Sequence, residues 1–298
     1  MTEAGPLLIR PARAEDREPV LAFCARTWNW GDYLPGVWND WMADPRGLFA
    51  VGEVGGQVIG VDKLTFLSDD EAFFEGLRID PDYRSQGYAG RFQRHMLEEA
   101  ARQGARVVRF LTAADNTAVH LMAERDGFRR GPTLLHWTAT PDPNLTGAPQ
   151  LTALAPGNTA YKAWAAFQRG PIWAALGGLL SYSWHAVEWT PARWAAMLGE
   201  GGLFVTPPAA DGAPGDLLAF MPDLHDPEQL WLAGMDAPLD ADRIAVLARA
   251  ARAHASQGYT TIQAMLPRLP EIESGLRAAS WDAEEQYAML LFEKVLRT

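Results

Sequence analysis

One segment of the 298-residue chain combines residue types that favour binding of a phosphate group. From Phe73 to Gly90 it has the sequence FFEGLRIDPDYRSQGYAG, an apolar strand pattern followed by a loop and the start of a helix pattern. The N-terminus of such a helix offers backbone N–H groups without intrahelical acceptors, and the helix dipole attracts anions there. Gly87 allows close approach of a phosphate, Ala89 is small, and Arg84 adds a positive charge. The segment predicts a pyrophosphate site, although a glycine-containing turn before a helix is also a common plain connection.

Other chemical signatures are missing from the sequence. No Gly-Lys-Ser/Thr of a Walker loop follows Gly87, and the glycine spacing does not fit the dinucleotide fingerprint. The six histidines and the single cysteine show no metal-ligand spacing, so we predict no metal site. Cys24 follows an apolar run, which favours a packed thiol over a nucleophile.

Alternating strand and helix patterns surround the phosphate segment. Apolar runs predict strands at 7–10, 48–51, 58–61, 73–79, 107–111 and 134–138. Helical spacing and end signals predict helices at 14–27, 89–103 and 117–125, with Gly104 ending the second of them. The sequence therefore predicts an α/β fold built on a mixed sheet (α+β).

The chain also shows signs of an internal duplication. Residues 141–150 contain three prolines and a glycine, which predicts a linker between domains at 1–140 and 151–298. Gly202–Val205 repeats Gly47–Ala50, and further pairs keep offsets of about 153–158 residues, a period that indicates duplicated domains. The copy has Asp236-Ala237-Pro238-Leu239-Asp240-Ala241-Asp242 where the phosphate loop would stand. Its carboxylates would repel a pyrophosphate, so we predict one cofactor site per chain.

These features together resemble the GNAT superfamily of acetyl-CoA-dependent N-acyltransferases. Arg84, Gly87 and Ala89 match its phosphate-loop pattern, Gln/Arg-x-x-Gly-x-Gly/Ala, and Asn116 and Gly127-Phe128 have the spacing of its Asn…Gly-Phe motif. The resemblance covers about 8–137 and implies two tandem GNAT-like domains, the second degenerate, with acetyl-CoA as the co-substrate. The residues that it implies for cofactor binding are Leu77, Arg78, Ile79, Arg84, Ser85, Gln86, Gly87, Tyr88, Ala89, Gly90 and Asn116. For Asn116, a helix N-cap is an equal alternative.

The resemblance also implies a reaction in which the acceptor amine attacks the thioester directly. Glu75 stands where the family often has its general base, and burial would raise the pKa of this carboxyl; a solvated or ion-paired glutamate is the alternative. A backbone N–H of the same strand would stabilise the developing oxyanion, and Gly76 predicts a bulge there. Many members carry a tyrosine as general acid where this chain has Ala123, so we assign no acid.

The acceptor is less well defined by the sequence. The 12 tryptophans gather at 28–41 and 164–194, and they fit either capture of an amine or packing of the core. We predict Trp28, Asp32 and Tyr33 as contacts of a cationic acceptor.

The composition and charge of the chain bear on three further questions: binding to nucleic acid, insertion into a membrane and secretion. A formal net charge of −11 argues against nucleic acid, and the longest uncharged stretch, 170–187, is too polar and glycine-rich for a membrane span. Residues 1–19 lack the apolar core of a signal peptide. We therefore expect a cytoplasmic acetyltransferase with a small-molecule amine acceptor and no membrane partner, its oligomeric state open. The alternative, favoured by Ala123 and the degenerate copy, is an acyl-CoA-binding sensor or scaffold without turnover.

Overall fold

The computed structural model describes residues 6–27, 31–208 and 215–296. The chain forms two compact units: unit 1 comprises residues 1–111, 116–130 and 292–298, and unit 2 comprises residues 112–115 and 131–291. These units interleave in the sequence. Strand β6 (Arg129–Ala139) lies mostly in unit 2, and β14 (Asp282–Val295) begins in unit 2 and ends in unit 1.

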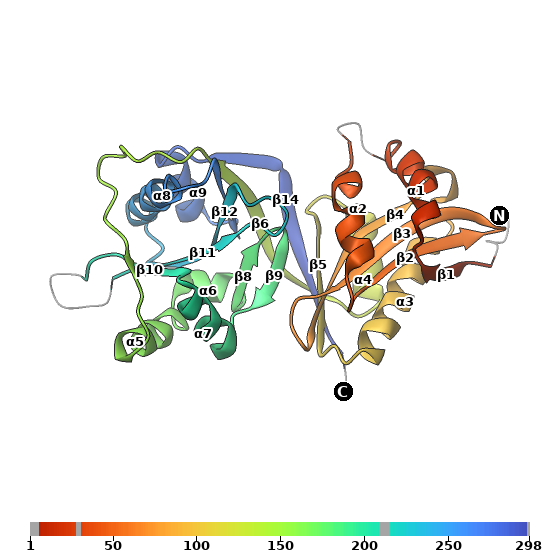
Figure 1. Ribbon diagram of the computed structural model, residues 1–298, viewed down its shortest axis with the longest axis horizontal. Coiled ribbons are helices and arrows are strands. Elements are labelled where there is room, and N and C mark those ends of the chain that lie inside the picture. The colour runs from red at the N-terminus through yellow and green to blue at the C-terminus, as the bar shows by residue number, and fades with distance from the viewer. Residues whose placement is uncertain (1–5, 28–30, 209–214, 297–298) are drawn as a thin grey trace. The chain divides into compact units, whose positions relative to one another are not determined.

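Unit 1 contains a sheet in the order β1-β2-β3-β4-β5 (Figure 1). Its strands are β1 (Leu8–Pro11), β2 (Leu48–Val54), β3 (Gln57–Phe66), β4 (Glu71–Ile79) and β5 (Val107–Ala113). The first four pair in antiparallel fashion, whereas β4 and β5 are parallel. The helices are α1 (Arg17–Cys24), α2 (Leu34–Ala43), α3 (Tyr88–Arg102) and α4 (Thr117–Arg125), with short 3-10 turns at Ala14–Asp16 and Pro81–Tyr83.

Helices cover both faces of this sheet. Helices α1 and α2 bury Val20, Trp38 and Trp41 against one face, where Val51 and Val61 complete the core. Helix α3 covers the other face: a Cβ on Gly60 would lie 2.8 Å from the ring of Phe92, so the glycine permits close packing. Helix α2 was not predicted from the sequence, because its apolar face is short and Pro35 stands in its first turn.

Unit 2 repeats the pattern with a sheet in the order β6-β13-β12-β11-β10-β7. These strands are β7 (Thr152–Ala153), β10 (Leu203–Val205), β11 (Leu217–Pro222), β12 (Gln229–Asp236) and β13 (Thr261–Pro267), and β8 (Leu179–Tyr182) and β9 (His185–Glu188) form a separate hairpin. Helices are α5 (Asn158–Phe167), α6 (Pro171–Ala175), α7 (Pro191–Glu200), α8 (Ala241–Ala255) and α9 (Pro270–Ala278). The predicted mixed α/β fold is confirmed.

The second tryptophan cluster forms part of the core of unit 2. The rings of Trp164 and Trp194 have centroids 5.0 Å apart, and Phe167 and Trp189 lie 4.0 Å apart. Trp189 and Trp194 are buried, which agrees with the packing interpretation for these side chains. Among the described helices, none is long and apolar enough to cross a membrane.

Candidate active site

The first feature of the site is a strand that leaves its neighbour. Strand β4 pairs with β5 at Glu71–Phe73, opposite Val107–Arg109, but β4 itself continues to Ile79. The second part of β4 therefore diverges from β5, and its backbone edge lies along the opening between the two strands. This divergent part contains Leu77, Arg78 and Ile79, which the sequence assigned to cofactor binding.

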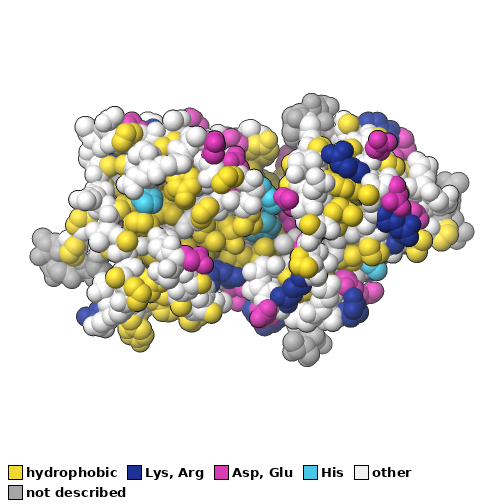
Figure 2. Space-filling model, viewed as in Figure 1, with side chains coloured by type: hydrophobic (Ala, Val, Ile, Leu, Met, Phe, Trp, Pro, Cys, Tyr) yellow, Lys and Arg dark blue, Asp and Glu magenta, His cyan; other side chains and the backbone are white. Residues whose placement is uncertain are grey.

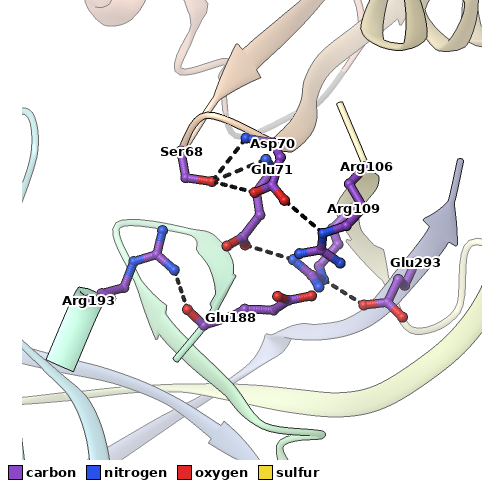
Figure 3. Close-up of polar contacts among 8 residues, drawn as sticks. All are labelled: Ser68, Asp70, Glu71, Arg106, Arg109, Glu188, Arg193 and Glu293. Carbon is purple, nitrogen blue, oxygen red and sulfur yellow. Dashed lines mark hydrogen bonds and ion pairs between the residues drawn. The ribbon is translucent and has the colours of Figure 1, made fainter. Parts of the chain in front are cut away.

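An ion-pair network fixes the end at which β4 and β5 stay paired (Figure 3). The guanidinium of Arg109 on β5 lies 2.9 Å from a carboxylate oxygen of Glu71 and 2.7 Å from one of Glu293. Arg109 is buried, so these contacts are screened little by water. Beside it, Arg106 pairs with Asp70 at 2.7 Å, and the hydroxyl of Ser68 donates to the same carboxylate group (Figure 3). The network holds the strands together on one side of the opening.

A bulge shapes β4 at the opening. Glu75 pairs with Lys63 and Arg78 with Val61, so Gly76 and Leu77 together stand opposite one residue of β3, Asp62. Gly76 has φ +78°, and a Cβ there would lie 2.5 Å from the ring of Trp41. The bulge predicted at Gly76 is present, and glycine is required by both the backbone angle and the packing.

The loop after β4 leads into α3 with an open anion-binding geometry. Asp80 accepts a hydrogen bond from the N–H of Asp82 at 3.1 Å, which turns the chain after the strand. Ser85 and Gly87 both have positive φ, +61° and +81°, and residues 84–87 are exposed. Gly87 is the N-cap of α3 and carries no capping side chain, and the first turn of α3 holds no acidic residue. The first N–H groups of the helix therefore face a site that suits an anion.

Two arginines lie near this loop. Arg84 folds back along it, where Nε donates to the carbonyl of Ile79 at 3.2 Å and Nη2 donates to the hydroxyl of Thr27 at 3.3 Å. Arg125, at the end of α4, reaches the first turn of α3: a Cβ on Gly90 would lie 2.7 Å from its Nη2. The sequence analysis missed Arg125, because nothing in the spacing indicates that the end of α4 reaches α3. On the viewed face of unit 1, basic and acidic side chains are otherwise interspersed (Figure 2).

Asn116 and the Gly-Phe motif have structural roles. Oδ1 of Asn116 accepts a hydrogen bond from the N–H of Val119 at 3.4 Å, as the N-cap of α4. Gly127 ends this helix region with φ +86°, and Phe128 packs edge-on against Phe110 at 5.1 Å. Ala123, the position without a tyrosine, is fully buried.

A polar cluster lies around the divergent part of β4. Glu75 is partly buried and accepts a hydrogen bond from the hydroxyl of Thr65 on β3. Nε of Arg78 pairs with Asp32 at 2.9 Å, and the side chain of Asp32 is only 3% exposed. The other oxygen of Asp32 accepts the N–H of Leu34 at 3.1 Å, which begins α2. The charge of Asp32 is therefore balanced by Arg78.

Tyr33 completes this cluster. Its ring lies over the guanidinium of Arg78, with the ring centroid 5.3 Å from Cζ. The residue is half exposed, and desolvation together with the negative charges of Glu75 and Asp32 outweighs the effect of Arg78 and raises the pKa of Tyr33. The hydroxyl therefore stays protonated and able to donate. Trp28, the third predicted acceptor contact, lies outside the described residues.

Two buried titratable groups, the thiol of Cys24 and the carboxyl of Asp62, have raised pKa values. Burial raises the pKa of the Cys24 thiol to about 12, as expected for a packed cysteine. Asp62 is 1% exposed, and burial raises the pKa of its carboxyl well above the usual range, with Glu75 adding to the effect. The sequence analysis missed Asp62. The available signal was a carboxylate directly after the apolar strand run 58–61, which predicts burial of a charge.

A known protein family matches the part of the chain that contains these features. The model of the Acetyltransferase (GNAT) family matches residues 16–128, which include β4, the loop and α3. The segment 16–128 of the chain belongs to the GNAT superfamily. This membership, predicted from the phosphate loop and the Asn…Gly-Phe spacing, is confirmed.

Two curated N-acetyltransferases align with part of the chain. "Probable N-acetyltransferase 16" of Homo sapiens is 33% identical over 110 residues, which cover 36% of this chain and 30% of that protein. "Histidine N-acetyltransferase" of Oreochromis niloticus is 30% identical over 91 residues, which cover 30% of this chain and 27% of that protein. The chain thus spans less than a third of either relative's length.

Solved structures resemble the whole chain in fold. A GCN5-related N-acetyltransferase from Sphaerobacter thermophilus superposes with a TM-score of 0.62 at 12% identity, covering 99% of this chain and 98% of that one. The GCN5-related glucosamine N-acetyltransferase region of a fungal multi-domain β-N-acetylglucosaminidase gives 0.58 at 12% identity, covering 97% of this chain and 38% of that one. At these identities the likeness concerns the fold alone.

Proposed function

We propose that unit 1 transfers an acetyl group from acetyl-CoA to a primary amine of a small-molecule acceptor. The observation that carries the proposal is the exposed loop at 84–87, with two positive-φ residues, which opens directly onto the N-terminus of α3 and follows the divergent part of β4. This combination places an anion cradle beside the edge of a strand that diverges from its neighbour, as a long thioester cofactor with a pyrophosphate requires.

The residues present fit acetyl-CoA. The N–H groups of Gln86 to Gly90 would hold the pyrophosphate, with charge from Arg84 and Arg125. A Cβ on Gly87 would meet no atom of the protein within 4 Å, so the space above the loop is open to a phosphate. The backbone of Leu77–Ile79 would pair with the amides of the pantetheine arm. We assign Asn116 to helix capping in this scheme.

The polar cluster supplies the groups that amine transfer needs. Acetyl-CoA contributes the activated acetyl thioester. Glu75, held by the hydroxyl of Thr65, takes a proton from the acceptor ammonium, and the free amine nitrogen then forms the new C–N bond as the C–S bond breaks. The CoA thiolate leaves with the electron pair of that bond and takes up the second proton, which the nitrogen loses on becoming an amide. Backbone N–H groups at the β4 bulge stabilise negative charge on the acetyl oxygen. The opposite charges of Arg78 and Asp32 neutralise each other. The negative charge of Glu75 then favours a cationic acceptor.

For the acceptor we propose the α-amino group of a free amino acid. The relative from Oreochromis niloticus is named for histidine, and its similarity falls in a segment of 91 residues. The ring of Tyr33 and the guanidinium of Arg78 would lie beside such an acceptor and could contact its carboxylate and side chain.

We further propose that residues 151–298 are a degenerate GNAT-like copy of 1–140 without a cofactor site, with the strands β6 and β14 exchanged between the two compact units. Strand β12 pairs with β13 only at Gln229–Leu232 and then diverges, as β4 does. The connection that follows is acidic instead of open to phosphate: the Asp240 carboxylate caps α8 by accepting the N–H of Arg243 at 2.8 Å.

Two measurements test the proposed function. Calorimetric titration of the full chain with acetyl-CoA should give one site per chain. Release of CoA thiol in the presence of histidine and other amino acids should then report transfer, and Glu75→Gln should lower kcat about 10²-fold at neutral pH while binding of acetyl-CoA is kept. Binding without transfer to any amine would support the sensor alternative, and unchanged kcat in Glu75→Gln would remove Glu75 as the base.

A further inference from the structure

The carboxyl group of Asp62 has a position that the proposed chemistry does not yet use. Asp62 lies on β3 opposite the bulge of β4, in the register gap between Glu75 and Arg78. Side chains alternate along a strand, so Asp62 shares the face of Gly60, which packs against Phe92 of α3, while Val61 belongs to the core of α1 and α2. Asp62 therefore stands directly behind the bulge.

The surroundings of Asp62 offer little to stabilise a negative charge. Its Oδ1 accepts the N–H of Lys63 at 3.0 Å, and the side chain is almost completely buried. The ammonium of Lys63 is engaged by Asp44 and by the carbonyl of Leu64. The β2 residue opposite Asp62 is Ala50, which carries no charge.

Two charged groups of β4, the register neighbours on either side of Asp62, act on its carboxyl in opposite directions. Arg78 favours ionisation of Asp62, and Glu75 opposes it. Because Arg78 is already paired with Asp32, burial decides the balance, and it raises the pKa of Asp62. The neutral form of the Asp62 carboxyl is therefore favoured, because the group is buried and accepts only the N–H of Lys63.

We propose that Asp62 is a positioning residue for acetyl transfer, which must remain a neutral acid behind the β4 bulge and whose ionisation stops the reaction. The inference rests on the proposed function. Negative charge develops on the acetyl oxygen beside the backbone N–H groups of the bulge, and a carboxylate at Asp62 would stand next to it in a site of low dielectric constant. The neutral acid adds no such opposition and continues to accept the N–H of Lys63.

The variant Asp62→Asn removes the ability of the side chain to ionise while nearly keeping its size and shape. Asparagine keeps the oxygen that accepts the N–H of Lys63 but cannot ionise. We expect the ratio of the wild-type kcat to the Asp62→Asn kcat to be constant at low pH and to fall about tenfold per pH unit above the pKa of Asp62. Ionisation of the amine acceptor affects both proteins equally and cancels in this ratio.

A second readout needs no turnover. The folded-state pKa of Asp62 is raised, so its contribution to stability is fully present below the unfolded-state value of about 4 and is lost as pH rises through the folded-state pKa. Across that window the unfolding constant of the wild type should rise about tenfold per pH unit relative to Asp62→Asn. Urea unfolding at several pH values measures it.

Asp16→Asn is the matched control. Asp16 is also a buried carboxyl of unit 1, but it pairs with Arg10 at 2.7 Å and lies in the turn before α1. Its loss should lower stability while leaving the kcat ratio independent of pH. A constant kcat ratio for Asp62→Asn above neutral pH, or an Asp62→Asn protein that fails to fold, would overturn the role of Asp62. A wild-type protein that transfers acetyl to no amine at any pH would instead refute the proposed function and this role with it.

Discussion

Gly87 offers the sharpest test of the cofactor loop, because its substitution by alanine adds one methyl group at a defined place. The residue has φ +81°, and an added Cβ would meet no protein atom within 4 Å. A non-glycine residue in this left-handed region costs about 1–2 kcal/mol, so Gly87→Ala should lower the free energy of unfolding by about that amount. Steric conflict within the protein contributes nothing to this loss.

The same methyl group would stand where a phosphate approaches the first turn of α3. Loss of one hydrogen bond to a charged group is worth about 1.5–3 kcal/mol, so acetyl-CoA should bind Gly87→Ala about 10- to 100-fold more weakly. Calorimetric titration measures the affinity, and urea unfolding measures the stability of the same preparation.

Gly104 supplies a matched control at the opposite end of α3. It has φ +89°, and a Cβ there would also meet nothing within 4 Å. Gly104→Ala should therefore show a similar loss of stability and no change in affinity. If Gly87→Ala binds acetyl-CoA as tightly as the wild type while both variants lose stability, the loop does not hold the pyrophosphate and the reasoning is refuted.

Two further predictions concern charges. Arg78→Met leaves the nearly buried carboxylate of Asp32 without its partner and should destabilise the protein by about 3–5 kcal/mol, whereas the double variant with Asp32→Asn should recover much of this loss in urea unfolding. Burial and, after it, the nearby Asp216 raise the pKa of Asp236 in unit 2 to about 6, so its contribution to stability is complete below about pH 4 and is lost as pH rises through 6. Asp236→Asn should flatten the pH dependence of stability in this window, and an unchanged slope would show that Asp236 is not perturbed.

Local patterns were enough to identify the elements that carry the site. The strand of residues 73–79, the turn at Gly87 and the helix after it could be predicted because strand alternation, helix periodicity and glycine at positive φ depend on neighbouring residues only. The bulge at Gly76 was predictable for the same reason, since a glycine inside a strand weakens it unless the backbone needs its freedom.

Local patterns could not predict side-chain contacts or strand pairs between residues that are far apart in the sequence. The sequence predicts Asp32 as a contact of a cationic acceptor. In the structure Asp32 also pairs with Arg78, which stands 46 residues later in the chain. Arg125 approaches Gly90 only because α4 packs near the start of α3. The exchange of β6 and β14 between the compact units likewise follows from sheet pairing, which composition does not report.

The sequence by itself was enough to predict the family and the fold class, because both depend on residue types at short, fixed spacings. The phosphate loop at 84–90 is a prediction of the same kind. Only the tertiary structure decided which charged side chains are paired, which are buried and which stay accessible to a substrate. It paired Asp32 with Arg78, buried Asp62 behind the bulge and left Glu75 partly exposed beside Thr65. The physical reason is that the ionisation and the reactivity of a side chain depend on its burial and on its charged neighbours, and both are set by the folding of distant segments onto one another.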